Sequence, residues 1–196
     1  MDTQQAVPPH RVNVRPQQAL VAIVYANEAY PRSTFERIVE QCRRWGLRPA
    51  GVLQHPVCSD GAGHCDVALE ELSTGLRTNL FEDRGPGASG CRLDQAALAH
   101  VNSQVARSFD ADPDILILNK FGKVEAEGRG LLDLVALAID RGIPVVIGVP
   151  VRNLTAWRKF ADGMSVELSG DAIEVIDWLG RTFPVAVAQR RELVPG

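Results

Sequence analysis

Charged side chains and glycines alternate in the segment Phe121–Gly130, directly after an apolar run that ends at Leu118. Glycine lets the backbone turn tightly and bring its N–H groups close to a ligand, and Lys123 and Arg129 add positive charge around Glu125. The segment therefore indicates a binding site for an anion. The alternative is an ordinary loop, because charge and glycine often follow a strand for purely structural reasons.

A second group of candidate ligand-binding residues lies in Gly90-Cys-Arg-Leu-Asp94. Cys91 and Arg92 precede an expected helix N-terminus, where free N–H groups favour anions. No histidine partner is evident from the spacing, so nucleophilic catalysis by Cys91 is not expected. We predict instead that Arg92 and the amides of this loop share one anion with the Lys123 segment, the alternative being a surface loop in which Arg92 pairs with a carboxylate.

Histidines and cysteines also gather shortly after the second expected strand, at His55, Cys58, His64 and Cys65. These residue types are the usual soft metal ligands. Their spacing matches no standard zinc site and lacks a C-x-x-C pair, so we predict no metal site. Cys42 lies on the apolar face of an expected helix and is expected to be a core thiol.

Apolar runs alternate with amphipathic segments along most of the chain, which predicts a parallel sheet covered by helices on both faces. The expected strands are 19–25, 48–54, 114–118, 143–149 and 165–168, and the expected helices are 33–45, 95–108, 130–141, 155–161 and 171–183. Residues 66–72 and 76–81 predict an antiparallel hairpin within a 55–93 extension, although the first of them is also compatible with a helix. Open parallel sheets hold ligands at the carboxyl ends of their strands. We therefore expect Arg92 and the Lys123 segment to face one crevice near the carboxyl ends of the first and third core strands.

Four segments together resemble an uncharacterised bacterial NTPase-like family associated with molybdenum transport, over about residues 19–180. They are Phe121–Gly130, Gly90–Asp94, Glu70–Gly75 and Trp157–Ala161. More distantly, the order of elements is similar to the small cancer-related nucleoside triphosphatases, which are P-loop proteins with a Gly-Lys-hydrophobic-Glu motif matched here by Gly122–Glu125. The resemblance implies an α/β fold: a P-loop NTPase-like three-layer sandwich with a mainly parallel sheet and a small antiparallel hairpin extension.

Two departures from that family pattern argue against hydrolysis of a nucleotide. Where the phosphate loop reads G-x-x-x-x-G-K-[ST], this chain has Ala26–Ser33, in which Pro31 lacks a backbone N–H that phosphate binding would use. The strand that should end in acidic residues ends in Asn119-Lys120, and an amide and a cation cannot replace carboxylates in magnesium binding or water activation. Arg32 is either a phosphate-contacting cation or an exposed first-turn arginine, and Ser33 is expected to be an N-cap rather than a magnesium ligand.

These observations predict a protein that binds an anionic small molecule on a degenerate P-loop scaffold. The candidate ligand-binding residues are Arg32, Ser33, Cys91, Arg92, Asn119, Lys123, Glu125 and Arg129, and none is assigned a catalytic role. The candidate ligands are molybdate and tungstate, which the family resemblance implies, or a nucleotide with magnesium. Two alternatives stay open: an active nucleoside triphosphatase that uses Lys123 and Glu125 in an altered site, and a regulatory subunit whose 55–93 extension is the contact surface.

Composition sets further expectations. The 196 residues of the chain predict one folded domain at 18–183 between a flexible leader, 1–17, and a tail, 184–196. The net charge is -3 and the pI is near 5.8. No basic stripe suggests nucleic-acid binding, and no apolar run approaches the roughly 20 residues of a membrane-spanning helix. We therefore expect a cytoplasmic protein, with a homo-oligomer or a protein partner left open.

Overall fold

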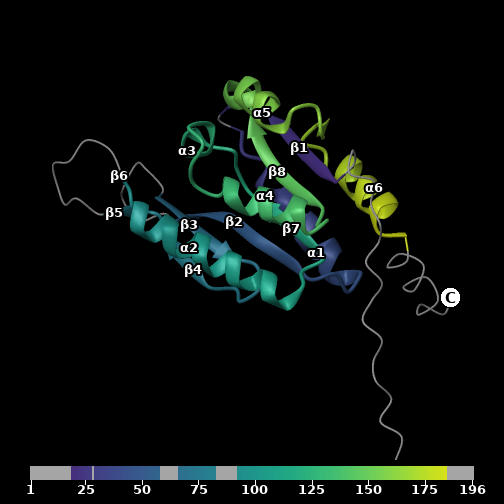
Figure 1. The fold of residues 1–196 in the computed structure, drawn as a ribbon, viewed down its shortest axis with the longest axis horizontal. Helices are drawn as coiled ribbons and strands as arrows, with labels where there is room; N and C mark the ends of the chain where they lie inside the picture. The colour runs from purple at the N-terminus through teal and green to yellow at the C-terminus, as the bar shows by residue number, and fades with distance from the viewer. Residues whose placement is uncertain (1–18, 28, 58–65, 83–91, 185–196) are drawn as a thin grey trace, which may run out of the picture.

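The structure is a computed structural model that describes residues 19–27, 29–57, 66–82 and 92–184. Its main sheet contains the parallel strands β1 (Leu20–Tyr25), β2 (Pro49–Val57), β7 (Ile115–Leu118), β8 (Val145–Pro150) and β9 (Ser165–Leu168). The antiparallel strands β3 (Asp66–Glu71) and β4 (Arg77–Asn79) extend it beyond β2. The strand order is β4-β3-β2-β7-β8-β1-β9, and β5 (Phe81–Glu82) and β6 (Arg92–Leu93) form a separate short ribbon (Figure 1).

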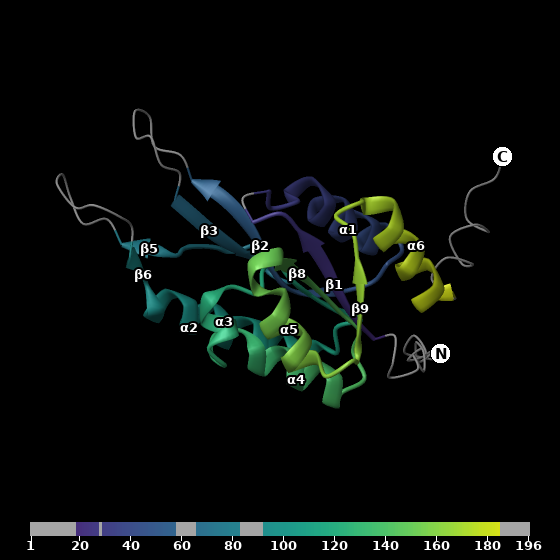
Figure 2. The ribbon, with the colours of Figure 1, turned by 90° about the horizontal axis from the view of Figure 1, so that it is seen from above.

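Helices cover the two faces of the sheet and make it the middle of three layers (Figure 2). One face carries α1 (Arg32–Arg44) and α6 (Ala172–Thr182). The other carries α2 (Gln95–Ser108), α4 (Leu132–Asp140) and α5 (Leu154–Ala161), with the short α3 (Lys123–Ala126) beside them. Single 3-10 turns, η2 (Phe109–Ala111) and η3 (Val151–Asn153), follow α2 and β8.

The core consists of two apolar layers, one on each side of the sheet. In β7, Leu116 and Leu118 belong to the layer under α2, α4 and α5, while Ile115 and Ile117 belong to the layer under α1 and α6. Successive side chains of a strand point to opposite faces, so a strand covered on both faces must be apolar throughout. This explains why the central strands are continuous apolar runs in the sequence.

The structure confirms most of the expected elements. Asp94 caps α2 as predicted, because its carboxylate accepts hydrogen bonds from the N–H groups of Ala96 and Ala97 at 2.8 and 3.0 Å. Residues 66–71 form a strand of the predicted hairpin, so the helical alternative for them is wrong.

Three boundaries differ from the expectation. Helix α1 begins at Arg32 with Pro31 in the N-cap position, so Ser33 lies inside the first turn and is not the N-cap. Lys123–Ala126 is a short helix rather than a loop, and α4 begins at Leu132 rather than at Gly130. Gly128 and Gly130 both have positive φ, which separates the two helices.

Several predictions concern residues that the structure does not describe. Cys58, His64, Cys65 and Cys91 lie outside the described residues, as do the leader, 1–17, and all but the first residue of the tail. The predicted domain boundaries therefore stay predictions. Among the helices that are described, none has both the length and the apolar character needed to cross a membrane.

Candidate functional site

The parallel strands β1, β7 and β8 end at the same side of the sheet, which we call the carboxyl edge. Tyr25 is the last residue of β1, Asn119 and Lys120 follow β7, and Arg152 lies in the turn after β8. The side-chain oxygen of Asn27 accepts a hydrogen bond from the backbone N–H of Arg152 at 2.8 Å, which connects the loop after β1 to the turn after β8. The carboxyl edge therefore brings together residues far apart in the sequence.

In the loop between β1 and α1, the side chain of Tyr30 packs against two other aromatic rings. The ring of Tyr30 stacks on Phe35, with ring centroids 5.5 Å apart, and meets Tyr25 edge to face at 6.0 Å. A backbone hydrogen bond of 2.9 Å from Ala29 N–H to the Ala26 carbonyl closes a turn in the same loop. The loop is packed against the apolar core through Tyr30, an arrangement unlike an open ring of amides around a phosphate.

The hydroxyl of Tyr25 is a buried polar group at this edge. The residue is 7% exposed, and its hydroxyl oxygen has no hydrogen-bond partner among the described residues. Burial raises the pKa of Tyr25 to about 12, and the positive charge of Arg152 acts in the opposite direction to a smaller extent. A buried hydroxyl without a partner costs roughly 1–3 kcal/mol, so Tyr25 offers a donor that a bound anion would satisfy.

Asn119 is buried where β7 ends. Its side-chain amide donates a hydrogen bond to the side-chain oxygen of Gln54 on β2 at 3.0 Å. A Cβ added at Gly148 would lie 2.3 Å from the Asn119 carbonyl oxygen, so the glycine allows β8 to pass close to the end of β7. Asn119 thus connects neighbouring strands at the carboxyl edge, and Lys120 follows it as a half-buried cation.

Glu125 holds the two ends of the segment between β7 and α4 together. Its carboxylate, in a residue 8% exposed, accepts hydrogen bonds from Gly122 N–H at 2.9 Å and from Leu131 N–H at 3.2 Å. Gly130 has φ +72°, and a Cβ there would lie only 2.2 Å from a Glu125 carboxylate oxygen. The geometry gives Glu125 and Gly130 a clear structural role.

The cations of this segment point into solvent. The side chain of Lys123 is 89% exposed, with its nearest carboxylate, Glu127, at 4.0 Å. Arg129 forms an ion pair with the same carboxylate at 2.5 Å. Exposed pairs of this kind contribute little to stability, which leaves both cations accessible to a ligand.

A small pocket of about 220 Å³ lies between the first half of α2 and the segment that contains α3. Leu93, Leu98, Asn102, Val124 and Arg129 are among its lining residues. None of its lining residues belongs to β1, so this pocket does not test the predicted crevice near the carboxyl ends of the first and third core strands. The side chain of Arg92 and all of Cys91 lie outside the described residues, so the shared anion stays a prediction.

The other candidate residues fall into two groups. Arg32 and Ser33 are exposed at the start of α1, on the face that also carries α6, and Arg32 pairs with Glu36 at 2.7 Å. Lys123, Glu125 and Arg129 lie on the opposite face, with Asn119 buried at the carboxyl edge. The candidate residues therefore do not form one binding site, and their binding roles stay predictions.

Sequence reasoning missed Tyr25, Tyr30 and Arg152 as candidates. Two signals were available: aromatic residues flank and enter a loop where the family pattern has glycines, and a cation follows the last long apolar run. Neither signal shows from the sequence alone that these residues lie close together, because only the order of the strands brings the turn after β8 next to β1.

Comparisons with known proteins agree with this architecture. Crystalline THEP1 from the hyperthermophile Aquifex aeolicus is similar in structure, with a TM-score of 0.54 at 16% identity over 76% of this chain and 88% of that chain. Together with the sheet described above, this likeness shows a P-loop NTPase-like α/β fold.

The chain is also similar in sequence to a much longer protein. The molybdenum import ATP-binding protein ModC 2 of Bradyrhizobium diazoefficiens is 36% identical over 151 residues, which are 76% of this chain and 17% of that protein. This chain therefore spans less than a fifth of the relative's length. A family profile matches residues 20–178, nearly the whole described fold, and the chain belongs to the family described as "Protein of unknown function (DUF2478)".

Proposed function

We propose that this protein binds a small oxyanion at the carboxyl edge of a P-loop NTPase-like fold and does not hydrolyse nucleoside triphosphates. The observation that carries the proposal is the buried hydroxyl of Tyr25, which has no partner among the described residues and lies within the electrostatic influence of Arg152. An oxyanion accepts hydrogen bonds and carries negative charge, so it can accept a hydrogen bond from the Tyr25 hydroxyl and is attracted by the positive charge of Arg152.

The surroundings of Tyr25 favour negative charge more generally. Lys120 and Arg152 follow the neighbouring strands β7 and β8, and parallel sheets bind their ligands at this edge. Arginine suits oxyanions because its planar guanidinium can donate two parallel hydrogen bonds. The tetrahedral anions molybdate, tungstate, phosphate and sulfate are small enough to be held by a few such donors.

A nucleoside triphosphate fits less well. Tyr30, in the loop that would surround the phosphates, packs its ring against Phe35 and Tyr25, and Pro31 removes one of the N–H groups of that loop. Asn119 and Lys120 stand where carboxylates would hold magnesium and orient water. Both features support binding without hydrolysis.

Among oxyanions, molybdate and tungstate are the first candidates. The support is the relationship to a protein whose name describes it as an ATP-binding protein of molybdenum import. That relative is much longer than this chain, and its related segment accounts for 17% of its length. The occurrence of a related segment within a much longer protein favours a second role, in which oxyanion binding regulates a partner protein.

The test is calorimetric titration with molybdate, tungstate, sulfate and phosphate, and with ATP in the presence and absence of magnesium. We expect saturable binding of at least one oxyanion, weakened by Arg152→Ala and unaffected by Arg158→Ala, whose guanidinium is exposed and paired with Glu167. At about a hundred times its dissociation constant, the anion should add about 2.7 kcal/mol of stability. Hydrolysis of ATP at about 1 s⁻¹ or faster, or no binding of any oxyanion, would contradict the proposal.

A further inference from the structure

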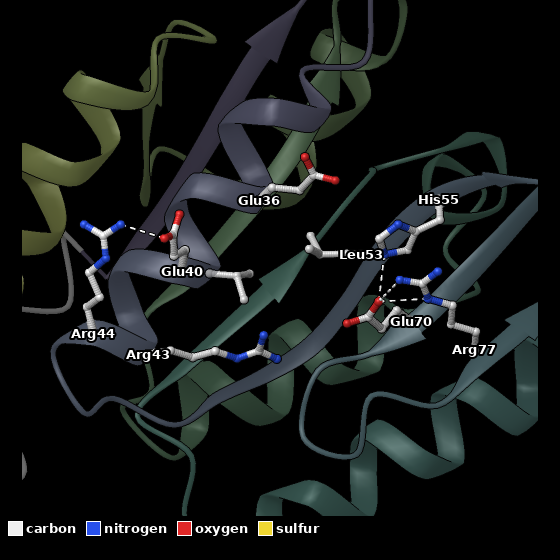
Figure 3. A pocket seen from close by; sticks show the side chains of 9 residues that line it. Glu36, Glu40, Arg43, Arg44, Leu53, His55, Glu70 and Arg77 are labelled. Carbon is white, nitrogen blue, oxygen red and sulfur yellow. Dashed lines mark hydrogen bonds and ion pairs between the residues drawn. The ribbon is translucent and has the colours of Figure 1, made fainter.

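A second concave site lies on the α1 side of the sheet, away from the carboxyl-edge residues. Its volume is about 600 Å³, and it lies between the outer side of α1 and the strands β2, β3 and β4 (Figure 3). On the opposite face these strands are covered by α2, whereas on this face α1 packs against β2 and no described helix packs to a similar extent against β3 or β4 (Figure 2). The lining residues are Glu36, Val39, Glu40, Arg43, Arg44, Leu53, His55, Glu70 and Arg77.

Three side chains on neighbouring strands form a fixed group on one wall of this site. Glu70 on β3 accepts hydrogen bonds from the Arg77 guanidinium at 2.8 and 3.0 Å, and Nε2 of His55 lies 2.9 Å from the same carboxylate oxygen. His55 comes from β2 and Arg77 from β4, the strands on either side of β3, and Figure 3 shows both side chains directed at the Glu70 carboxylate. The negative charge of Glu70 is therefore already compensated by side chains of the sheet.

The other acidic groups that line the site are also paired. Glu40 lies 2.6 Å from the Arg44 guanidinium, and Glu36 lies 2.7 Å from Arg32. Arg43 differs, because in the part of the chain that the structure describes it pairs with no carboxylate. Its guanidinium donates one hydrogen bond to the Leu72 carbonyl at 3.1 Å.

That single bond makes Arg43 a positioned donor. A guanidinium has five N–H groups, so most of those on Arg43 remain available to a ligand. The side chain reaches from α1 toward the strands, and the contact with Leu72 restrains it there (Figure 3). A donor that is held in place before binding loses less conformational entropy when the ligand arrives.

Apolar side chains form the floor of the same site. Val39 and Leu53 belong to the core layer under α1, and both line the site. A volume of this size lies within the range of about 300–1,000 Å³ that is typical of small-molecule pockets. The site thus combines an uncompensated cation with apolar surface.

We propose that this site binds a small organic anion, with its carboxylate or phosphate group on Arg43 and its apolar body over Val39 and Leu53. None of the lining residues belongs to the carboxyl edge, so this binding is independent of the oxyanion proposed there. Carboxylates and phosphates share the recognition chemistry, because both accept paired hydrogen bonds from a guanidinium.

The test is an NMR titration of the full chain with phenyl phosphate, benzoate and inorganic phosphate, which separates the two anionic groups and shows the contribution of the apolar body. We expect saturable shifts of the backbone amides of Val39, Arg43 and Leu53 with phenyl phosphate or benzoate, and weaker binding of inorganic phosphate. Arg43→Ala should weaken binding at least tenfold, as expected for a lost hydrogen bond to a charged group. The matched control, Arg37→Ala, removes an exposed arginine of the same helix that does not line the site, and it should change affinity less than about twofold.

Arg43→Gln provides a second variant that keeps a donor for the Leu72 carbonyl while removing the charge, and it should also weaken binding at least tenfold. The proposal is wrong if neither aromatic anion binds more tightly than about 1 mM. It is equally wrong if Arg37→Ala weakens binding as much as the Arg43 variants do, or if all saturable shifts lie around Tyr25 and Arg152. The last outcome would leave the carboxyl-edge proposal intact.

Discussion

Replacing Tyr25 by phenylalanine should stabilise the ligand-free protein and weaken oxyanion binding at the same time. The substitution removes only the hydroxyl, whose oxygen is buried and has no partner among the described residues. The desolvation of such a group costs roughly 1–3 kcal/mol, so its removal recovers part of that free energy. For a domain of this size, 1 kcal/mol corresponds to about 2–4 °C in melting temperature.

The same substitution removes a donor to the proposed anion. A hydrogen bond to a charged group contributes about 1.5–3 kcal/mol, so the dissociation constant of the oxyanion should rise roughly tenfold to a hundredfold. Opposite signs for stability and affinity distinguish a functional hydroxyl from a structural one. Differential scanning calorimetry without ligand and calorimetric titration with molybdate or tungstate measure the two quantities.

A satisfied buried hydroxyl provides the contrast. The hydroxyl of Thr182 donates a hydrogen bond of 2.9 Å to the Trp178 carbonyl within α6. Thr182→Val should therefore destabilise the protein by about 0.5–1.5 kcal/mol and leave oxyanion affinity unchanged. The reasoning is refuted if Tyr25→Phe destabilises the free protein as Thr182→Val does, or if it leaves oxyanion affinity unaltered.

Four further substitutions test the remaining parts of the structure by thermal or chemical denaturation. Gly130→Ala should lower the free energy of unfolding by at least about 2 kcal/mol, because the new Cβ would collide with Glu125 and the φ is unfavourable for alanine. Gly128→Ala should lower it by only about 1 kcal/mol, because Gly128 has φ +79° and open space around it. Equal losses would contradict the role of Glu125. Lys123→Ala should change stability by less than about 0.5 kcal/mol, since the side chain is exposed, and a larger loss would make it structural. Burial raises the pKa of Cys42 from 9.0 to about 12, so the folded state keeps this proton and the free energy of unfolding should fall as the pH rises from 9 toward 12. Cys42→Ala should make that fall shallower, and an unchanged slope would show that the thiol does not contribute.

The amino-acid sequence by itself determined the layered architecture. Short runs such as Ile115–Leu118, in which each successive side chain is apolar, are typical of strands covered on both faces. Local chemistry also predicted the start of α2, since Asp94 has the side chain that satisfies free N–H groups at a helix start. The hairpin of β3 and β4 was visible from the turn residues that separate its two strands.

The tertiary structure decided which residues share a site. Strand order placed β8 between β7 and β1, so Arg152 came to act on Tyr25 although more than a hundred residues separate them. Packing turned Tyr30 inward and gave Glu125 backbone partners, and neither outcome follows from residue type, because a tyrosine or a glutamate in a loop is equally compatible with solvent. Periodicity and capping act within a few residues, whereas burial and charge pairing depend on which distant segments the fold brings together.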